Sequence, residues 1–213
     1  MSEMIPQGWE VVKLNTLVEH FQNGFAFSSK GYVDRGVPIV TIANISVDGG
    51  YTFNELKENK WSFDSTENLE RYIVKNDSLI ISMTDVTPTM NLLGRGAIVK
   101  RKGMMYLNQR VGLLNILPIC NKHYLAYYFN GSNWRNYCRR SAGLAAQANL
   151  GTKDILEGLI KMPPLAEQQK IASILTSIDD NIQQEQKELE QTKNLKKSLM
   201  QDLLTGKVRV KMD

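Results

Sequence analysis

The segment MPPLAEQQKIASIL (Met162–Leu175) opens a polar stretch that closes with LMQDLLTGKVRV (Leu199–Val210). The 41 residues 165–205 contain neither glycine nor proline. The Pro163–Pro164 pair fixes the backbone before this stretch because proline does not fit in a helix interior, and Gly206 stands where a helix would end. We therefore predict one helix over residues 165–205, about 60 Å long at 1.5 Å per residue.

Apolar side chains recur along this helix at alternating spacings of four and three residues. Glu185, Thr192 and Lys196 interrupt the series, and such polar positions can fix the register of a helix pair. The spacing is typical of a coiled coil and predicts that the helix pairs with a second helix, most simply in a homodimer. The alternative is an amphipathic helix packed on its own domain. The predicted dimer-interface residues are Ile171, Leu175, Ile178, Ile182, Leu189, Leu199 and Leu203.

Length and composition indicate one domain over residues 1–162, followed by the helical region 163–213. Hydrophobic residues make up 42% and charged residues 23% of the 213-residue chain, which is ordinary for a soluble protein. The sequence has no apolar run of membrane-spanning length and no secretory signal, so we expect a cytoplasmic protein without membrane contact. Cys120 and Cys138 form no metal-binding spacing with the two histidines, so we expect no metal site. We expect reduced thiols, with a disulfide between the two cysteines as the alternative.

The positive charge of the chain is unevenly distributed. The net charge is +4; residues 1–162 carry 18 basic and 14 acidic side chains, whereas residues 163–213 carry 8 of each. The 68 residues Val86–Lys153 contain ten basic side chains and no aspartate or glutamate. A local positive potential attracts phosphates, so this distribution favours a nucleic-acid partner. Basic side chains scattered over several faces, serving only solubility, are the alternative.

The remaining sequence predicts an α+β domain in which strands and helices alternate irregularly. Leu14, Leu17, Val18 and Phe21 have helical spacing and predict a short helix over residues 13–22. Strands are expected at 39–42, 72–74, 79–81, 97–100, 110–117 and 159–162. Further helices are expected over 121–137, with Gly131 at a break, and over 153–159.

No catalytic motif is recognisable in the sequence. A phosphate-binding glycine-lysine loop, a serine nucleophile motif and a glycine-rich cofactor loop are all missing. Met162–Leu165 is only superficially similar to the Pro-Pro tetrapeptide of amino-methyltransferases, because the leading Asn or Asp and the trailing aromatic residue are absent. His20, placed on the 13–22 helix, and His123 are expected to be ordinary structural or surface residues. We therefore expect a chain that is not an enzyme.

Candidate DNA-binding residues fall in two segments of the carboxylate-poor region. The polar loop 84–95 and the segment 135–149 carry hydroxyl, amide and guanidinium groups that can bind base edges or phosphates. A helix end whose arginines satisfy the helix dipole is an equally simple interpretation of residues 139 and 140. The candidates in these two segments are Thr84, Thr87, Asn91, Arg95, Arg139, Arg140 and Gln147, and the basic turn between two expected strands adds Lys100, Arg101 and Lys102.

The sequence resembles the specificity (HsdS-type) subunit of type I restriction–modification systems. The strongest similarity is PPLAEQQKIASILTSIDDNI followed by LKKSLMQDLLTGKVRV; IPQGWEVVKL, NGFAF, GVPIV, NDSLIISM and LGRGAIV support it. Members of this family have two target recognition domains and two helical regions in one chain. This chain has one of each. The resemblance therefore implies a half-length form with one target recognition domain and one long helix.

The resemblance implies a non-catalytic subunit that selects a bipartite sequence in double-stranded DNA. It further implies a modification subunit that binds S-adenosylmethionine and methylates adenine, and a restriction subunit that uses ATP, so cofactors are expected on the partners and none on this chain. Two copies paired antiparallel would rebuild the full architecture; a different half-subunit is the other possibility. A coiled-coil adaptor that binds protein, and a stand-alone methyltransferase, remain as competing hypotheses.

Overall fold

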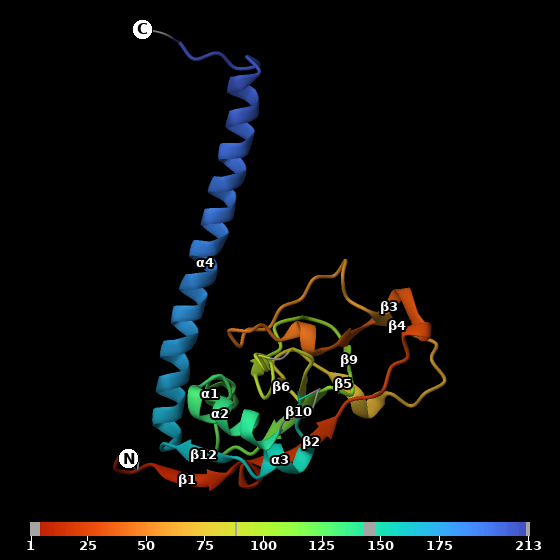
Figure 1. Cartoon of the computed structure of the whole chain (residues 1–213), viewed down its shortest axis with the longest axis vertical. Coiled ribbons are helices and arrows are strands. Elements are labelled where there is room, and N and C mark those ends of the chain that lie inside the picture. The colour runs from red at the N-terminus through yellow and green to blue at the C-terminus, as the bar shows by residue number, and fades with distance from the viewer. Residues whose placement is uncertain (1–4, 88, 143–147, 212–213) are drawn as a thin grey trace. The chain divides into compact units, whose positions relative to one another are not determined.

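The computed structural model of the chain describes residues 5–87, 89–142 and 148–211. The chain divides into two compact units, Met1–Ala172 and Ser173–Asp213. The first unit combines sheets with short helices, and a single long helix runs on from it (Figure 1). The predicted α+β class and long C-terminal helix are confirmed. The first two turns of that helix belong to the first unit.

The central sheet of the first unit has the strand order β2–β10–β6–β8, with all neighbours antiparallel. Its strands span Val18–Asn23 (β2), Leu79–Ser82 (β6), Gly96–Ile98 (β8) and Val111–Ile116 (β10). In β6, Leu79 and Ile81 join one buried cluster and Ile80 joins another, because successive side chains of a strand point to opposite faces. Both faces are covered, which explains an apolar run without polar alternation.

A second sheet packs around an aromatic core. Its order is β4–β3–β9–β5, and only the β3–β9 pair is parallel among its described pairings. The ring of Phe27 lies 4.9 Å from Phe25, 5.0 Å from Trp61 and 6.1 Å from Tyr106, measured between centroids. The strands span Tyr32–Val40 (β3), Lys60–Trp61 (β4), Ile73–Val74 (β5) and Met105–Leu107 (β9).

Three short helices and two small strand pairs cover the other face of the central sheet. Helix α1 contacts β6 and β8, and Phe129 and Trp134 are fully buried against this face. Antiparallel pairing joins β1 to β12 and β7 to β11. The elements are β1 (Glu10–Lys13), β7 (Thr84–Asp85), α1 (Lys122–Tyr128), α2 (Ser132–Ser141), β11 (Ala148–Asn149), α3 (Thr152–Leu156) and β12 (Leu159–Met162). Short 3-10 segments occupy Leu14–Thr16, Ser29–Gly31, Ile42–Asn44 and Glu70–Tyr72.

Helix α4 spans Leu165–Leu204, 40 residues, and ends as the glycine position predicts. Gly206 has φ +70, and its amide donates to the carbonyl of Leu203 (3.2 Å). At the other end, the buried Gln168 amide accepts from Asn121 N–H (2.8 Å) and donates to the carbonyl of Pro163 (2.8 Å). The start of α4 is thereby bonded to the start of α1.

Two predicted elements differ from the structure. The helix over 13–22 is wrong: a 3-10 turn is followed by strand β2, so His20 lies on a strand. Pairing of β2 with β10 outweighs the local helical spacing, and Leu14 and Leu17 instead point into the core. The single helix over 121–137 is two helices, with the break at Phe129–Gly131 where Gly131 is extended. The strands predicted around 39–42, 72–74, 79–81, 97–100, 110–117 and 159–162 are confirmed within a few residues.

Candidate nucleic-acid interface

The loop 86–93, which follows β7 and is described at every position except 88, is hydrogen-bonded on its inner side to two buried charged residues. Asp85 is 1% exposed, and its carboxylate accepts from the Thr87 amide (2.7 Å), the Thr87 hydroxyl (2.8 Å) and the Leu92 amide (2.6 Å). Arg135 of α2 is 3% exposed and donates one Nη2 group to the carbonyls of Met90 (2.6 Å) and Asn91 (2.8 Å). Val86, Thr87, Thr89 and Asn91 are exposed.

Asp85 and Arg135 are both charged at neutral pH. Burial opposes ionisation of Asp85, but hydrogen bonds from Leu92 and Thr87 and the charge of Arg135 outweigh it, so its pKa is lowered. Burial, together with the charges of Arg95 and Arg139, lowers the pKa of Arg135 to about 10. The loop is therefore hydrogen-bonded to an ionised carboxylate, Asp85, and an ionised guanidinium group, Arg135.

Arg95, Arg135 and Arg139 form a group of neighbouring positive charges, here called the arginine group. Arg95 donates to the carbonyl of Asn91 (2.5 Å) and to the side-chain oxygen of Asn130 (3.3 Å). Burial lowers the pKa of Arg95; the charge of Asp48 opposes this and that of Arg139 adds to it. Arg139 is half-buried, and its Nε has no hydrogen-bond partner in the described structure. Arg95 and Arg139, the partly exposed members of this group, place positive charge beside an exposed polar loop, which suits a phosphate-bearing ligand.

The predicted DNA-binding residues do not form one continuous set. Thr87, Asn91, Arg95 and Arg139 gather around the loop 86–93, and Arg140 is exposed one residue farther along α2. Arg95 directly precedes strand β8, whereas the basic turn Lys100–Lys102 follows the other end of that strand. There the Arg101 guanidinium lies over the ring of Phe53, 4.4 Å from its centroid. The predicted residues therefore form two separate sets, one around the loop 86–93 and one at the basic turn Lys100–Lys102.

Two further predicted residues fall outside the exposed set. Thr84 is buried, with 1% exposed, in the β7–β11 pair opposite Asn149. A buried hydroxyl offers nothing to a base edge, so Thr84 has no place in an interface formed by this conformation. Gln147 lies outside the residues that the structure describes.

Asp85 and Arg135 belong to the two candidate segments, but they were not among the predicted DNA-binding residues, and their burial and their bonds to the loop were not predicted. Both were visible as members of the loop and of the basic stretch, but nothing in a single sequence indicates which charged residues are buried. The signal that could have found Asp85 is its place before Thr87 and Thr89, since an aspartate two residues ahead of a threonine readily accepts local backbone bonds.

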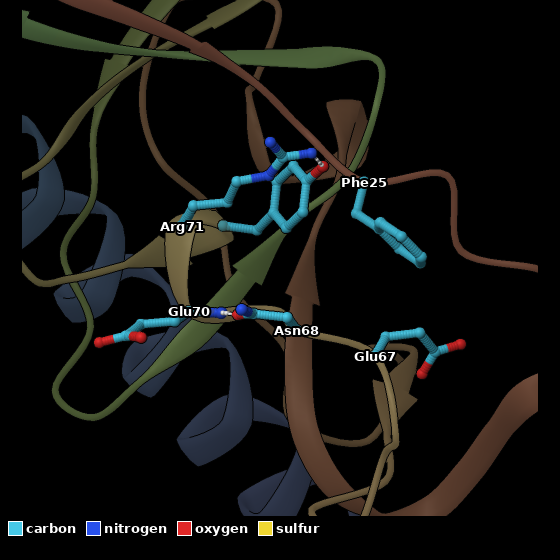
Figure 2. A pocket seen from close by; sticks show the side chains of 6 residues that line it. Phe25, Glu67, Asn68, Glu70 and Arg71 are labelled. Carbon is cyan, nitrogen blue, oxygen red and sulfur yellow. Dashed lines mark hydrogen bonds between the residues drawn. The ribbon is translucent and has the colours of Figure 1, made fainter.

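A separate open pocket of about 740 Å³ lies in the region of the second sheet. Figure 2 shows its lining, with Phe25, Glu67, Asn68, Glu70 and Arg71 labelled. Arg71 lies over the Tyr72 ring, 4.7 Å from its centroid, and donates to the Tyr72 hydroxyl. The two glutamates make this pocket unsuited to a polyanion, so it does not extend the DNA-binding candidates.

The predicted seam of α4 is exposed beyond the first turns of the helix. Ile171 packs against the core cluster of the first unit, and Leu175 is half-buried. Ile178 is 47%, Ile182 49% and Leu189 54% exposed, and Leu199 and Leu203 are similar. An aliphatic stripe of this length open to water is a surface suited to another helix.

Other features of the described part of the chain concern metal binding, thiol reactivity and membrane spanning. Within it, no group of three or more histidine, cysteine or acidic side chains could hold a metal ion. Cys120 and Cys138 are free and buried, and burial raises the pKa of each thiol to about 12. None of the described helices is both long and apolar enough to cross a bilayer.

Comparison with known proteins matches almost the whole chain to one family. The model of the type I restriction modification DNA specificity domain matches residues 6–194. The chain is 30% identical over 216 residues to the type I restriction enzyme MjaVIII specificity subunit of Methanocaldococcus jannaschii, with 97% of this chain and 48% of that protein covered. The EcoBI specificity subunit of Escherichia coli is 24% identical over 207 residues, with 96% and 39% covered.

Solved structures show the same fold. The S subunit of the type I restriction–modification system of M. genitalium superposes with a TM-score of 0.62 at 14% identity, covering 91% of this chain and 45% of that one. The HsdS subunit of Thermoanaerobacter tengcongensis gives a TM-score of 0.54 at 19% identity, covering 94% and 46%. This chain spans about half the length of the curated relatives it matches. By the match over residues 6–194, the chain belongs to the family of type I restriction modification DNA specificity domains.

Proposed function

We propose that this chain selects the DNA sequence on which a type I restriction–modification complex acts. The observation that carries the proposal is the family match over residues 6–194. The half-buried Arg95 and Arg139 beside the loop 86–93 support it, because phosphates bind where positive charge reaches the surface and exposed hydroxyl and amide groups can read base edges. In this proposal Thr87, Asn91 and Arg139 face the DNA.

The basic turn Lys100–Lys102 has a different place in this proposal. It lies apart from the arginine group, and its lysines are exposed. Its contribution would be contact with backbone phosphates, which positions the protein without reading sequence.

A half-length chain needs a second half to read a bipartite target, and we propose a second copy of the same chain. The support is the exposed stripe that includes Ile178, Ile182 and Leu189. Antiparallel pairing of two α4 helices is isologous, so one stripe covers the other and both recognition units are related by a two-fold axis. The DNA target is then two inverted half-sites separated by an unread spacer.

The chemistry belongs to partner subunits in this proposal. A modification subunit holds S-adenosylmethionine and methylates adenine, and a restriction subunit uses ATP. The chain itself acts as a non-catalytic, cytoplasmic specificity subunit. Its contribution to the reaction is the choice of the adenine that the partner modifies.

Binding of the chain, assembled with its modification subunit, to DNA at several salt concentrations tests the function. We expect one sequence to bind about a thousandfold or more tighter than unrelated DNA, with affinity falling as salt rises. A complex that binds all DNA equally, or whose binding does not respond to salt, contradicts the proposal.

A further inference from the structure

The loop 86–93 and the adjoining Gly94 are held to helix α2 by hydrogen bonds to their backbone carbonyls. Arg135 binds the Met90 and Asn91 carbonyls, and the Trp134 indole donates to the Gly94 carbonyl (2.8 Å). A β-carbon added to Gly94 would lie 2.3 Å from the Cys138 sulfur, so the chain passes α2 at a distance that only glycine permits. The loop therefore follows α2 along about one turn.

Burying the charged Arg135 side chain costs free energy unless its hydrogen bonds and neighbouring charges compensate for the lost contact with water. Its Nε and Nη1 have no hydrogen-bond partner in the described residues, although the side chain is 3% exposed. A methionine would fill a similar volume without removing a charge from water. The hydrogen bonds that the structure gives this guanidinium group both end on loop carbonyls. The buried Arg135 side chain thus binds the loop through these two hydrogen bonds.

The backbone of the loop is strained where Arg135 holds it. Met90 has φ +49, which is uncommon for a residue other than glycine, and its carbonyl accepts the Arg135 bond. Such a conformation persists only where the surroundings determine it. Asp85 supplies the matching constraint, because it binds the amides of Thr87 and Leu92 on either side of Met90.

We propose that Arg135 is a positioning residue for sequence recognition: it fixes the loop 86–93 so that the exposed side chains of Thr87 and Asn91 meet base edges in one geometry, while Arg135 itself stays out of contact with DNA. The inference rests on the proposed DNA-specificity function and adds a residue to it. A loop that is already ordered loses less conformational entropy on binding than a mobile one. Arg135 therefore contributes to discrimination between sequences and little to non-specific attraction.

The experiment compares Arg135→Met and Arg135→Lys with the wild-type chain, each assembled with the modification subunit. Arg71→Met is the matched control, since this arginine also bonds within the first unit but lies at the acidic pocket. For each protein we measure the thermal midpoint, amide hydrogen exchange of residues 86, 87 and 89–93, and affinity for target and unrelated DNA across a salt series. The target is first identified by mapping methylated adenines.

For Arg135→Met we expect faster exchange at the loop amides and a loss of target affinity of roughly tenfold or more, of the size that one disrupted base contact produces. Affinity for unrelated DNA and the salt slope should stay within error, because no phosphate contact is lost. Arg135→Lys keeps the charge, but its side chain ends one bond short of the Nη2 atom that donates to both carbonyls, so it should show a smaller loss in the same direction. Arg71→Met should match the wild type in discrimination and in loop exchange.

Two results overturn the inference. If Arg135→Met weakens target and unrelated DNA equally and lowers the salt slope by about one, Arg135 binds a phosphate instead. If loop exchange and discrimination are unchanged, the loop does not depend on it. Should Arg135→Met fail to fold, Arg135→Lys decides: wild-type exchange and discrimination in that variant contradict positioning. A wild-type complex without any sequence preference refutes the proposed function, and loop exchange still reports whether Arg135 anchors the loop.

Discussion

Asp85 concentrates three hydrogen bonds on one buried carboxylate at the start of the loop 86–93. This explains why an acidic residue directly precedes the 68-residue stretch without any. Its negative charge also lies near Arg135 and offsets part of the positive charge of the arginine group. Asp85 and Arg135 together set the loop backbone, and the side chains of Thr87 and Asn91 stay exposed on it.

Asp85→Asn should lower stability at neutral pH by about 1–3 kcal/mol, because an amide cannot accept all the bonds of a carboxylate. The pKa of Asp85 is lowered from 3.8, so its contribution is complete above that value and disappears as the pH falls through the folded-state pKa. Urea midpoints measured between neutral pH and pH 2.5 should converge for wild type and variant at the acid end. A constant difference over that range contradicts a role for the ionised carboxylate.

Arg139→Ala should weaken DNA binding by about 1–3 kcal/mol, since the residue is half-buried beside the loop within the arginine group. If it reads a base, target binding falls and unrelated DNA is bound as before; if it binds a phosphate, all sequences weaken alike. Titrations of the complex with both DNAs distinguish the two. If variant and wild type bind both DNAs with equal affinity, Arg139 is not part of the interface.

At the scale of elements, the segments that carry the family resemblance contact one another. Trp9 of IPQGWE donates to Glu167 of PPLAEQ (3.3 Å), and strand β1 pairs with β12 just before α4. Gln168, in the same PPLAEQQ segment, binds the start of α1 and the carbonyl of Pro163. These motifs therefore anchor the first turn of α4, which includes Glu167 and Gln168, to the rest of the first unit.

Gln168→Leu tests this anchoring. The Asn121 amide and the Pro163 carbonyl would lose their partner in a buried site, which costs about 1–3 kcal/mol per unsatisfied group. We expect a lower midpoint of unfolding for the first unit and faster amide exchange around residues 121 and 165–172. Gln169→Leu, at the adjacent exposed position, is the control and should leave both measurements unchanged.

Replacing Ile178 and Ile182 with glutamate tests helix pairing. Both side chains are about half exposed in the isolated chain, so the substitutions remove no core packing, but they place charges in the proposed seam. We expect a folded first unit, unchanged in thermal midpoint of its sheet signal, and monomers in sedimentation where the wild type is dimeric. A wild type that stays monomeric with the modification subunit and DNA present contradicts the homodimer.

The sequence predicted the elements whose pattern is local or fully buried. Helix α4 follows from the absence of glycine and proline, and β6 from its short apolar run. Strand β2 was missed because its pairing with β10 joins residues about ninety positions apart, and helical spacing of four apolar residues gave the wrong period. The loop residues at the candidate site were identified, but the burial of Asp85, Thr84 and Arg135 depends on tertiary packing that no local pattern encodes.

At the scale of the whole molecule, the proposed function requires that a chain with one recognition unit takes part in binding a bipartite target. The chain covers 48% of its 30%-identical relative and matches its family over residues 6–194. A symmetric dimer restores two recognition units and requires an inverted-repeat target. Helices of about 60 Å could separate the half-sites by no more than roughly 18 base pairs at 3.4 Å each.

The most direct test of this account is the map of methylated adenines in cells that express the modification subunit with and without this chain. We predict a single methylated motif of two inverted half-sites around a fixed spacer, present only when the chain is expressed. An identical methylation map without the chain would contradict its role in specificity. A motif that depends on the chain but has two unrelated halves would contradict the symmetric dimer and require a different second subunit.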